Sequence, residues 1–219
     1  MYKRDLVILF SVILILGIFF RFATLGHKAY WYDETFTSLQ LSGYSTTEIQ
    51  EVVVTGEILN IEALQEYQNP NRENTVVDTI KRIALVEPQL TPLYFVLLYY
   101  WVNFFGDSIT IIRSFSAVVS LLTFPALYWL CWELFQSRST GWIAVSLIAV
   151  SPFHIMYAQE ARPYALWTVM ILVSCAIFLR AVRLNSIKTW LLYGVTTLIG
   201  LYSFLFTGFI TILYSMFFL

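Results

Sequence analysis

Long apolar runs are the feature that most restricts how this chain can fold. The runs are about 15–25 residues long, the length of helix that crosses a hydrocarbon core of about 30 Å. Hydrophobic residues make up 58% of the 219 residues and charged residues only 12%, whereas a typical soluble domain is about 25% charged. Lipid offers no hydrogen bonds to a bare backbone, so the runs must be helical, and the short alternating segments of a transmembrane barrel are not seen. We therefore expect an all-α polytopic membrane protein.

The apolar runs predict five complete spans and the start of a sixth. They lie at about residues 6–25, 109–134, 141–157, 164–180, 189–205 and 208–219. The last run is still apolar where the sequence stops, which indicates a chain truncated at its C-terminus. Residues 1–219 are therefore expected to form a single transmembrane module.

Basic residues set the expected orientation. Lys3 and Arg4 precede the first span, and positive flanks favour the cytoplasmic side. We expect a multi-pass protein of the plasma (inner) membrane with a cytoplasmic N-terminus. Arg21, near the far end of this span, is expected to extend to the lipid headgroups. A cleaved signal peptide is the alternative, but no small-residue cleavage site follows and more spans come later.

Residues 26–108 form a long loop that is expected on the extracytoplasmic face. Ten of the 14 acidic residues lie between Gly26 and Glu87, and few basic residues accompany them, which suits the non-cytoplasmic side. Apolar residues recur at helical spacing in 46–67 and in 78–86. These stretches predict short juxtamembrane helices.

The apolar stretch Pro92–Phe105 leaves two topologies open, because it is short for a span. If it crosses the membrane, the basic loops at Arg138 and at residues 180–188 fall on the outside, against the positive-inside tendency. If it lies flat in the interface, both basic loops are cytoplasmic. The second topology also places the loop at residues 159–163 on the same outer face as the acidic loop, and we adopt it.

Charge and rare residue types argue against two classes of partner. The net charge is −1, so no nucleic acid is expected. Cys131 and Cys175 lie inside apolar runs, where cysteine behaves as a small hydrophobic residue. His27 and His154 are far apart in the sequence, and no Cys/His spacing fits a metal site.

Two polar clusters stand out because charge is costly at a membrane. Residues 30–34, Tyr-Trp-Tyr-Asp-Glu, follow the first span directly. Residues 157–164, Tyr-Ala-Gln-Glu-Ala-Arg-Pro-Tyr, lie between two later spans. Each cluster has an ordinary explanation, an aromatic belt with solvated acids for the first and a solvated loop pair for the second. The adopted topology places both on one side of the membrane, which favours a functional site.

These clusters occur within an ordered set of motifs. The set comprises Trp31–Glu34, Glu87–Tyr94, Phe105–Ser108, Arg113 and Gln159–Tyr164. In this order it resembles the GT-C superfamily of membrane glycosyltransferases, and most closely bacterial members of glycosyltransferase family 39, the protein O-mannosyltransferase and aminoarabinose-transferase-like group. The resemblance covers essentially the whole chain, whereas members of the family are normally much longer.

Two departures from the family pattern concern histidines. Many relatives have His-Pro-Pro before a Leu-Tyr pair, where this chain has Leu90-Thr91-Pro92. Many also have a histidine in a later span, where this chain has Leu201-Tyr202-Ser203-Phe204. Any role of those histidines is therefore in doubt here.

The resemblance implies that a sugar passes from a polyprenyl-phosphate donor to a lipid, glycan or protein acceptor on the extracytoplasmic face, by an inverting displacement. An acceptor hydroxyl needs a general base within hydrogen-bond reach. By analogy Asp33 is this base and Glu34 is a supporting or acceptor-orienting carboxylate. Membrane lipids are the other expected partners.

The leaving lipid phosphate is an anion and needs positive charge. Arg162 offers a planar fork that matches phosphate oxygens, and Arg113 is a second candidate, for which headgroup contact is an equally good explanation. Glu160 could hold Arg162 or bind sugar hydroxyls. Gln159 and Tyr164 complete the expected substrate-binding set, although for Tyr164 an aromatic belt is the better explanation.

No cofactor is expected. Some GT-C relatives use a divalent ion held by carboxylates, but the second cluster here has one acid and one arginine, Glu160 and Arg162. This pair suggests that an arginine takes the place of the metal as phosphate clamp. A divalent metal is thus possible but not favoured.

Two other classes of function remain open. A transporter or flippase would have inverted repeats and broken helices with ionisable residues near the midplane, and the central parts of these spans carry no charge. A non-catalytic fragment is the third interpretation. Enzymatic activity distinguishes these classes from a glycosyltransferase.

Cysteine labelling tests the adopted topology. In a chain with Cys131 and Cys175 changed to alanine, Ser45→Cys and Ser186→Cys are expected to react with a membrane-impermeant maleimide from opposite sides. Ser186 lies in a loop that is expected in the cytoplasm, and Ser45 lies in the loop that is expected outside. The measurement compares labelling of intact cells with labelling of inverted vesicles. Labelling of both positions from the same side would contradict the assignment.

Overall fold

The computed structural model describes residues 3–44, 46–54, 59–61, 67 and 75–218, and within them every regular element is a helix. The helices are α1 (Lys3–Phe22), α2 (Tyr32–Ser42), α3 (Thr46–Val53), α5 (Val76–Val86), α6 (Pro92–Phe105), α7 (Ile109–Leu121), α8 (Thr123–Phe135), α9 (Arg138–Ala149), α10 (Pro152–Ala158), α11 (Tyr164–Leu184), α12 (Ile187–Ser203) and α13 (Thr207–Phe218). The expected all-helical fold is confirmed. Much of the expected helical stretch 46–67 lies outside the described residues.

Within the described residues, three helical segments are long and apolar enough to cross a membrane. They are Arg4–Phe22, Ile109–Phe135, which joins α7 and α8, and Tyr164–Leu184. The pair α9 and α10 makes a fourth if it is counted as one broken span. Helices with this length and composition identify a multi-pass membrane protein.

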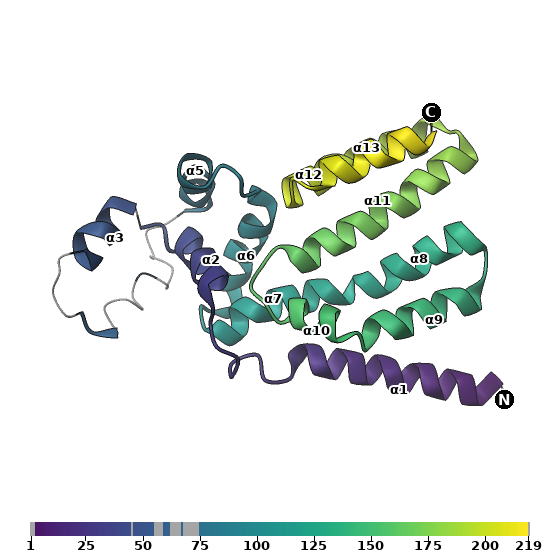
Figure 1. The fold of residues 1–219 in the computed structure, drawn as a ribbon, viewed down its shortest axis with the longest axis horizontal. Helices are drawn as coiled ribbons and strands as arrows, with labels where there is room; N and C mark the ends of the chain where they lie inside the picture. The colour runs from purple at the N-terminus through teal and green to yellow at the C-terminus, as the bar shows by residue number, and fades with distance from the viewer. Residues whose placement is uncertain (1–2, 45, 55–58, 62–66, 68–74, 219) are drawn as a thin grey trace.

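The long helices lie side by side, and the short helices gather at one end of them (Figure 1). Helices α2, α3, α5 and α6 form this end. The N-terminus, the turn between α8 and α9 and the turn between α11 and α12 lie at the opposite end. Each turn is followed by a basic residue, because α9 begins at Arg138 and Lys188 lies in the first turn of α12. The fold therefore separates a basic end from the end with the acidic loop.

One carboxylate is buried at the basic end. The side chain of Glu133 on α8 is 1% exposed and forms ion pairs with Arg180 and Arg183 on α11. The indole nitrogen of Trp129 donates a further hydrogen bond of 3.0 Å to Glu133. These contacts tie α8 to α11 where the two helices leave the apolar layer.

Helix α6 is too short to cross a bilayer upright. Its 14 residues rise about 21 Å at about 1.5 Å per residue, against a core of about 30 Å. It begins with Pro92 in the first turn, where a missing N–H costs nothing, and stops at Gly106, whose φ is 108°. Its buried face, including Tyr94 and Leu98, packs in the main apolar core with Phe115 of α7. It lies beside α2 and α5 (Figure 1).

The expected span at residues 141–157 is bent. Helices α9 and α10 meet at 62° across a short break, and Pro152 occupies the first turn of α10. Proline lacks the N–H that would continue α9 and fits the first turn of a new helix. The bend carries the chain sideways and delivers residues 159–163 to the space between α1 and α11 (Figure 1).

Arg21 does not extend to the headgroups, and that expectation is wrong. Its side chain is fully buried and donates hydrogen bonds to Gly17 O (2.8 Å), Ala149 O (2.6 Å) and Ile148 O (3.1 Å). The helices approach closely because a Cβ on Gly17 would lie 2.5 Å from Ala149 O. The last carbonyls of a helix lack the usual N–H partner, and here the buried guanidinium bonds Ala149 O, while Ile148 O also accepts from Ser151 N.

Candidate active site

A buried ion pair between α2 and α7 organises the acidic end of the bundle. Glu34 and Arg113 are both 0% exposed, and they meet as a two-pronged pair: Arg113 Nε donates to Glu34 Oε1 (2.8 Å) and Nη2 donates to Oε2 (2.7 Å). Two parallel charge-assisted hydrogen bonds fix orientation as well as distance. The pair therefore sets the position of α2 relative to α7.

The remaining donors of Arg113 hold the chain that links α1 to α2. Nη1 donates to Leu25 O (2.6 Å) and Lys28 O (2.8 Å), and Nη2 donates to Ala29 O (2.9 Å). With the two bonds to Glu34, all five N–H donors of the guanidinium have partners. Arg113 therefore has no donor left for a substrate phosphate, which does not fit the expected substrate-binding role. Its full burial does not fit the alternative, contact with lipid headgroups.

The loop between α10 and α11 is attached to the same pair. The backbone N–H of Ala161 donates to Glu34 Oε1 (2.9 Å). On the α1 side, Gln159 Nε2 donates to Phe20 O (2.6 Å) and Ala23 O (2.9 Å). Residues far apart in the sequence are thereby held at one place, and Gln159 acts on α1 rather than facing the rest of the site.

A second ion pair lies at the edge of the buried one. Arg162 Nη2 lies 3.7 Å from Asp33 Oδ2, with side chains that are 12% and 32% exposed respectively. Arg162 Nη1 also donates to the backbone oxygen of Asp33 (3.2 Å) and to Thr37 Oγ1 (3.5 Å). The Nε of Arg162 has no hydrogen-bond partner among the described residues. Asp33 and Arg162 are thus adjacent, partly accessible and incompletely bonded.

Glu160 forms a third charged contact on this face. Its Oε1 accepts a hydrogen bond of 3.0 Å from Lys28 Nζ, and its side chain is 7% exposed. Its Oε2 is buried and has no partner among the described residues. Lys28 was not expected from the sequence, where it is one lysine in a long loop with no motif around it.

Buried hydroxyl groups support the loop that carries Arg162. Ser116 Oγ donates to Arg162 O (3.4 Å) and shares a hydrogen bond of 2.9 Å with Tyr94 OH. Tyr30 OH shares a bond of 2.6 Å with Ser38 Oγ. Burial raises the pKa of the Tyr30 phenol to about 12, so this group stays protonated at neutral pH. Tyr94 ends the Glu87–Tyr94 motif but was given no role there, and the sequence held no signal for Ser116, because serine is common in apolar helices.

An apolar cavity of about 490 Å³ opens beside Arg162. Its walls come from the turn before α6, from α6 itself and from the turn between α12 and α13: Gln89, Leu90, Thr91, Phe95, Arg162, Pro163, Phe204, Leu205, Phe206 and Phe209. We call this cavity the Arg162 groove. One guanidinium therefore stands at the end of an otherwise largely apolar groove.

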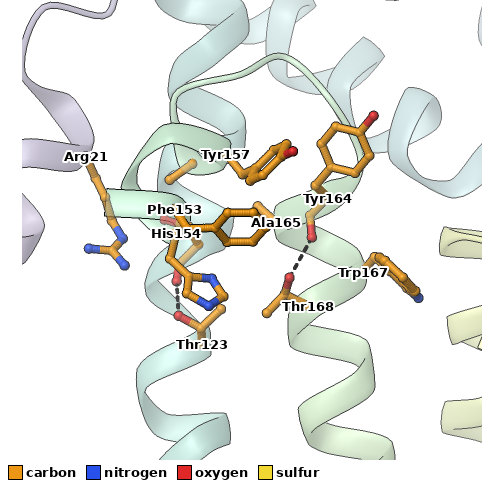
Figure 2. A pocket seen from close by; sticks show the side chains of 11 residues that line it. Arg21, Thr123, Phe153, His154, Tyr157, Tyr164, Ala165, Trp167 and Thr168 are labelled. Atoms are coloured by element: carbon orange, nitrogen blue, oxygen red, sulfur yellow. Dashed lines mark hydrogen bonds between the residues drawn. The ribbon is translucent and has the colours of Figure 1, made fainter. Parts of the chain in front are cut away.

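A separate cavity of about 270 Å³ is lined mainly by residues of α10 and α11 (Figure 2). Tyr157 and Tyr164 extend over it, and His154 and Thr123 lie below them (Figure 2). Tyr164 also places its ring 5.8 Å from the guanidinium carbon of Arg162. We call this cavity the Arg21 pocket, since Arg21 forms one of its walls.

The structure brings together most of the residues expected at the site. Asp33, Glu34, Arg113 and Arg162 form two neighbouring ion pairs, and Glu160 adjoins them through the same loop. Of the two roles expected for Glu34, its burial against Arg113 fits a supporting carboxylate better than one that contacts an acceptor. No group of three or more His, Cys, Asp or Glu side chains within the described residues is arranged to hold a metal ion.

Residues 88–219 match the family described as dolichyl-phosphate-mannose-protein mannosyltransferase. The chain belongs to this family. The part of this mannosyltransferase that matches the family includes all residues of the Arg162 groove. It also includes Arg113, Glu160 and Arg162. No curated protein and no solved structure matches the chain.

Membership establishes the general activity. The chain is a membrane glycosyltransferase of the mannosyltransferase family, which uses a sugar donor linked to a lipid phosphate. Asp33 and Glu34 precede the matched residues, so their place beside Arg113 and Arg162 rests on the contacts described above.

Removing one member of the buried pair is expected to destabilise the fold strongly. Arg113→Met leaves the Glu34 carboxylate buried and unpaired, at a cost of about 3–5 kcal/mol. The double variant Glu34→Met/Arg113→Met leaves no buried charge and is expected to unfold at a higher temperature than Arg113→Met. The unfolding temperatures of both variants are measured in detergent, by the loss of the folded-protein peak in size-exclusion chromatography after heating.

Arg180→Met is the matched control, because Arg180 is an ion-paired arginine whose side chain is 47% exposed. Its removal is expected to change stability by less than about 1 kcal/mol. Equal losses for Arg113→Met and Arg180→Met would contradict the structural role of the buried pair.

Proposed function

We propose that the chain transfers mannose from a polyprenyl-phosphate donor to a hydroxyl of an acceptor protein on the extracytoplasmic face, with inversion at the sugar carbon. The observation that carries this proposal is the meeting of Asp33 and Arg162. They are 129 residues apart in the sequence, yet Arg162 Nη2 lies 3.7 Å from Asp33 Oδ2. Arg162 also lines the Arg162 groove. A general base, a phosphate-binding cation and a lipid-binding surface are thus contiguous.

Asp33 is the general base of this proposal. Its carboxylate is partly exposed, so an acceptor hydroxyl can reach it. As the acceptor oxygen attacks the sugar carbon, Asp33 takes the hydroxyl proton, which is the role a positioned carboxylate performs in general-base catalysis. The bond between the sugar carbon and the phosphate oxygen breaks, and its electrons leave with the lipid phosphate.

Arg162 stabilises the departing phosphate. The charge that develops on the phosphate oxygens is best met by preorganised donors, and the unpaired Nε of Arg162 is one such donor. The sugar must lie between the base and the phosphate in an inverting displacement. The ion pair between Asp33 and Arg162 therefore opens when the donor binds, and its partial exposure permits this.

The Arg162 groove accommodates the first isoprene units of the donor. Its walls are mainly aromatic and aliphatic, and Leu205, Phe206 and Phe209 are exposed at its outer side. A polyprenyl chain in this groove stays in apolar surroundings while its phosphate reaches Arg162. The donor phosphate can therefore bind the enzyme while the polyprenyl chain stays in the membrane.

Glu34 and Arg113 are positioning residues in this proposal. They touch neither substrate, but they fix α2, which carries Asp33, and the loop that carries Arg162. Glu160, with its free Oε2, is the candidate partner for sugar hydroxyls. Tyr164 is an aromatic contact on the far side of Arg162.

Several finer assignments belong to the same proposal. The chain has a GT-C arrangement close to glycosyltransferase family 39, its N-terminus lies in the cytoplasm, and α6 lies flat at the outer face of the plasma membrane. The acidic end of the bundle then faces the compartment in which the acceptor is found. The family description supports the choice of mannose and of a protein acceptor.

Asp33→Asn is expected to lower turnover about 100-fold or more, since general-base catalysis contributes about that much. Asparagine keeps the shape of the side chain but cannot take the proton. Transfer from a radiolabelled polyprenyl-phosphate mannose donor in proteoliposomes measures the effect. Asp107→Asn, at an exposed acid after α6, is the matched control and should leave turnover unchanged. Turnover of Asp33→Asn near that of the wild type would remove Asp33 from the mechanism.

Arg162→Ala is expected to weaken donor binding about tenfold or more, because a charge-assisted hydrogen bond contributes about 1.5–3 kcal/mol. The effect should be smaller for Arg162→Lys, which keeps the charge but not the planar fork. The KM for the lipid donor and the turnover number at saturating donor are measured together. An unchanged KM in both variants would show that Arg162 does not bind the phosphate.

A further inference from the structure

Arg21 is a buried cation without a carboxylate partner among the described residues. Its side chain is fully buried and hydrogen-bonds to backbone carbonyl oxygens, and its guanidinium carbon lies 4.8 Å from the centre of the Phe124 ring. By contrast, Arg113, Arg162, Arg180 and Arg183 each form an ion pair with a carboxylate. An unpaired charge is costly in an apolar environment, so a source of negative charge near Arg21 would stabilise the fold.

The end of α9 compensates only part of this charge. The two α9 oxygens that Arg21 contacts, on Ile148 and Ala149, belong to the last turn of α9, where the helix dipole supplies about half a negative charge. The Nε of Arg21 is buried and lacks a hydrogen-bond partner among the described residues. A purely structural role as a cap for α9, even with the Phe124 ring against the guanidinium, therefore leaves the buried Nε–H without an acceptor.

The Arg21 pocket lies directly beside this group. It has a volume of about 270 Å³ and is lined by side chains from five helices: Arg21, Ser120, Thr123, Phe153, His154, Tyr157, Ala158, Tyr164, Ala165, Trp167 and Thr168. Figure 2 shows the Arg21 guanidinium on one side of the pocket, with the His154 ring next to it and the aromatic rings above. The pocket therefore combines a cation and polar groups with an aromatic wall.

This pocket is distinct from the Arg162 groove. The two cavities have no lining residue in common. Trp167 of the pocket stacks on Phe204 of the groove, with ring centroids 4.6 Å apart, and Tyr164 lies 6.2 Å from Phe204. An aromatic wall thus separates two cavities that each contain one arginine, and a ligand in the Arg21 pocket does not take the place of the donor.

The place of Arg21 in α1 indicates a depth near that of lipid phosphates, although its side chain turns into the bundle. It is in the last turn of α1, one residue before the end of the span Arg4–Phe22, and headgroups begin where the apolar segment of a span ends. Phe153, at the edge of the pocket, is 61% exposed, so the pocket adjoins the surface that faces lipid. A phosphate that reaches this level on a diacyl lipid needs no path through the protein.

We propose that the Arg21 pocket binds the headgroup phosphate of an anionic membrane phospholipid. The phosphate would accept from the unpaired Nε–H of Arg21, and the acyl chains would lie against the exposed ring of Phe153. A phospholipid is favoured over free phosphate because half of the walls are aromatic or aliphatic. It is favoured over the polyprenyl donor because the groove beside Arg162 already provides a phosphate-binding cation with an apolar channel.

The lipid would also support the candidate active site. The pocket is bounded by α10 and by the C-terminal end of α1, and Gln159, directly after α10, is bonded to Phe20 O and Ala23 O at that end. A headgroup between these elements neutralises Arg21 and holds the bend between α9 and α10. The loop that carries Arg162 begins at this bend.

Lipid binding tests the proposal without any activity measurement. The purified chain is placed in phosphatidylcholine nanodiscs with increasing fractions of phosphatidylglycerol, and retained phosphatidylglycerol is counted by native mass spectrometry. Arg21→Gln keeps hydrogen-bond donors for the α9 carbonyls but loses the charge, and Thr168→Trp fills the pocket with Arg21 unchanged. Each variant is expected to lower retention about tenfold, the value of one charge-assisted contact. Arg138→Gln, at the basic end, is the matched control.

Each result supports or overturns the proposal. Loss of retained phosphatidylglycerol in Thr168→Trp, with retention by Arg138→Gln, supports it even if Arg21→Gln fails to fold. Equal retention by the wild type and by Thr168→Trp overturns it. Displacement of the phosphatidylglycerol by inorganic phosphate, or competition by a polyprenyl phosphate, also overturns it, since the site would then belong to a free anion or to the donor.

Discussion

The acidic end of this protein depends on the buried pair of Glu34 and Arg113. Charges are costly to bury, and such a pair is tolerated only when its geometry is close to ideal and its remaining donors are bonded. Both conditions hold, because the two side chains meet in parallel and the other N–H groups of Arg113 bind the chain before α2. Asp33 and Arg162 owe their proximity to this arrangement. The outer pair is partly exposed, whereas the pair beneath it is fully buried and bonded at every donor of Arg113.

The sequence predicted the class of fold from a strong physical constraint. Lipid forces apolar runs into helices, so the all-helical membrane architecture followed from run length and low charge. Asp33, Glu34, Glu160 and Arg162 were singled out as charges at places where charge is expensive, and the family resemblance implied their roles. The structure brings these residues to one face, and their roles stay predictions. Their contacts were not predictable. Whether a carboxylate next to another is exposed or buried depends on the helix that packs against it, here α7 with Arg113.

Arg113 and Arg21 show where sequence reasoning was insufficient. An arginine near the end of an apolar run can extend to the headgroups or turn inward, and local sequence does not distinguish the two outcomes. Arg113 turns inward because it forms a buried ion pair with Glu34. Arg21 turns inward because the small residue Gly17 lets α1 pack against the last carbonyls of α9. The bend of α9 and α10 had a signal, Ser151-Pro152, which is typical of the start of a helix. The continuous apolar run around it concealed the break.

The shortness of α6 has a consequence for how the enzyme meets its substrate. A helix of about 21 Å does not span the apolar layer, and Phe95 of α6 lines the same groove as the exposed rings of Phe206 and Phe209. A donor that uses this groove arrives and departs by lateral diffusion within the leaflet. The relevant supply is then the number of donor molecules per unit area of membrane rather than per unit volume, and dilution of the bilayer with other lipids acts on the enzyme as dilution of the substrate.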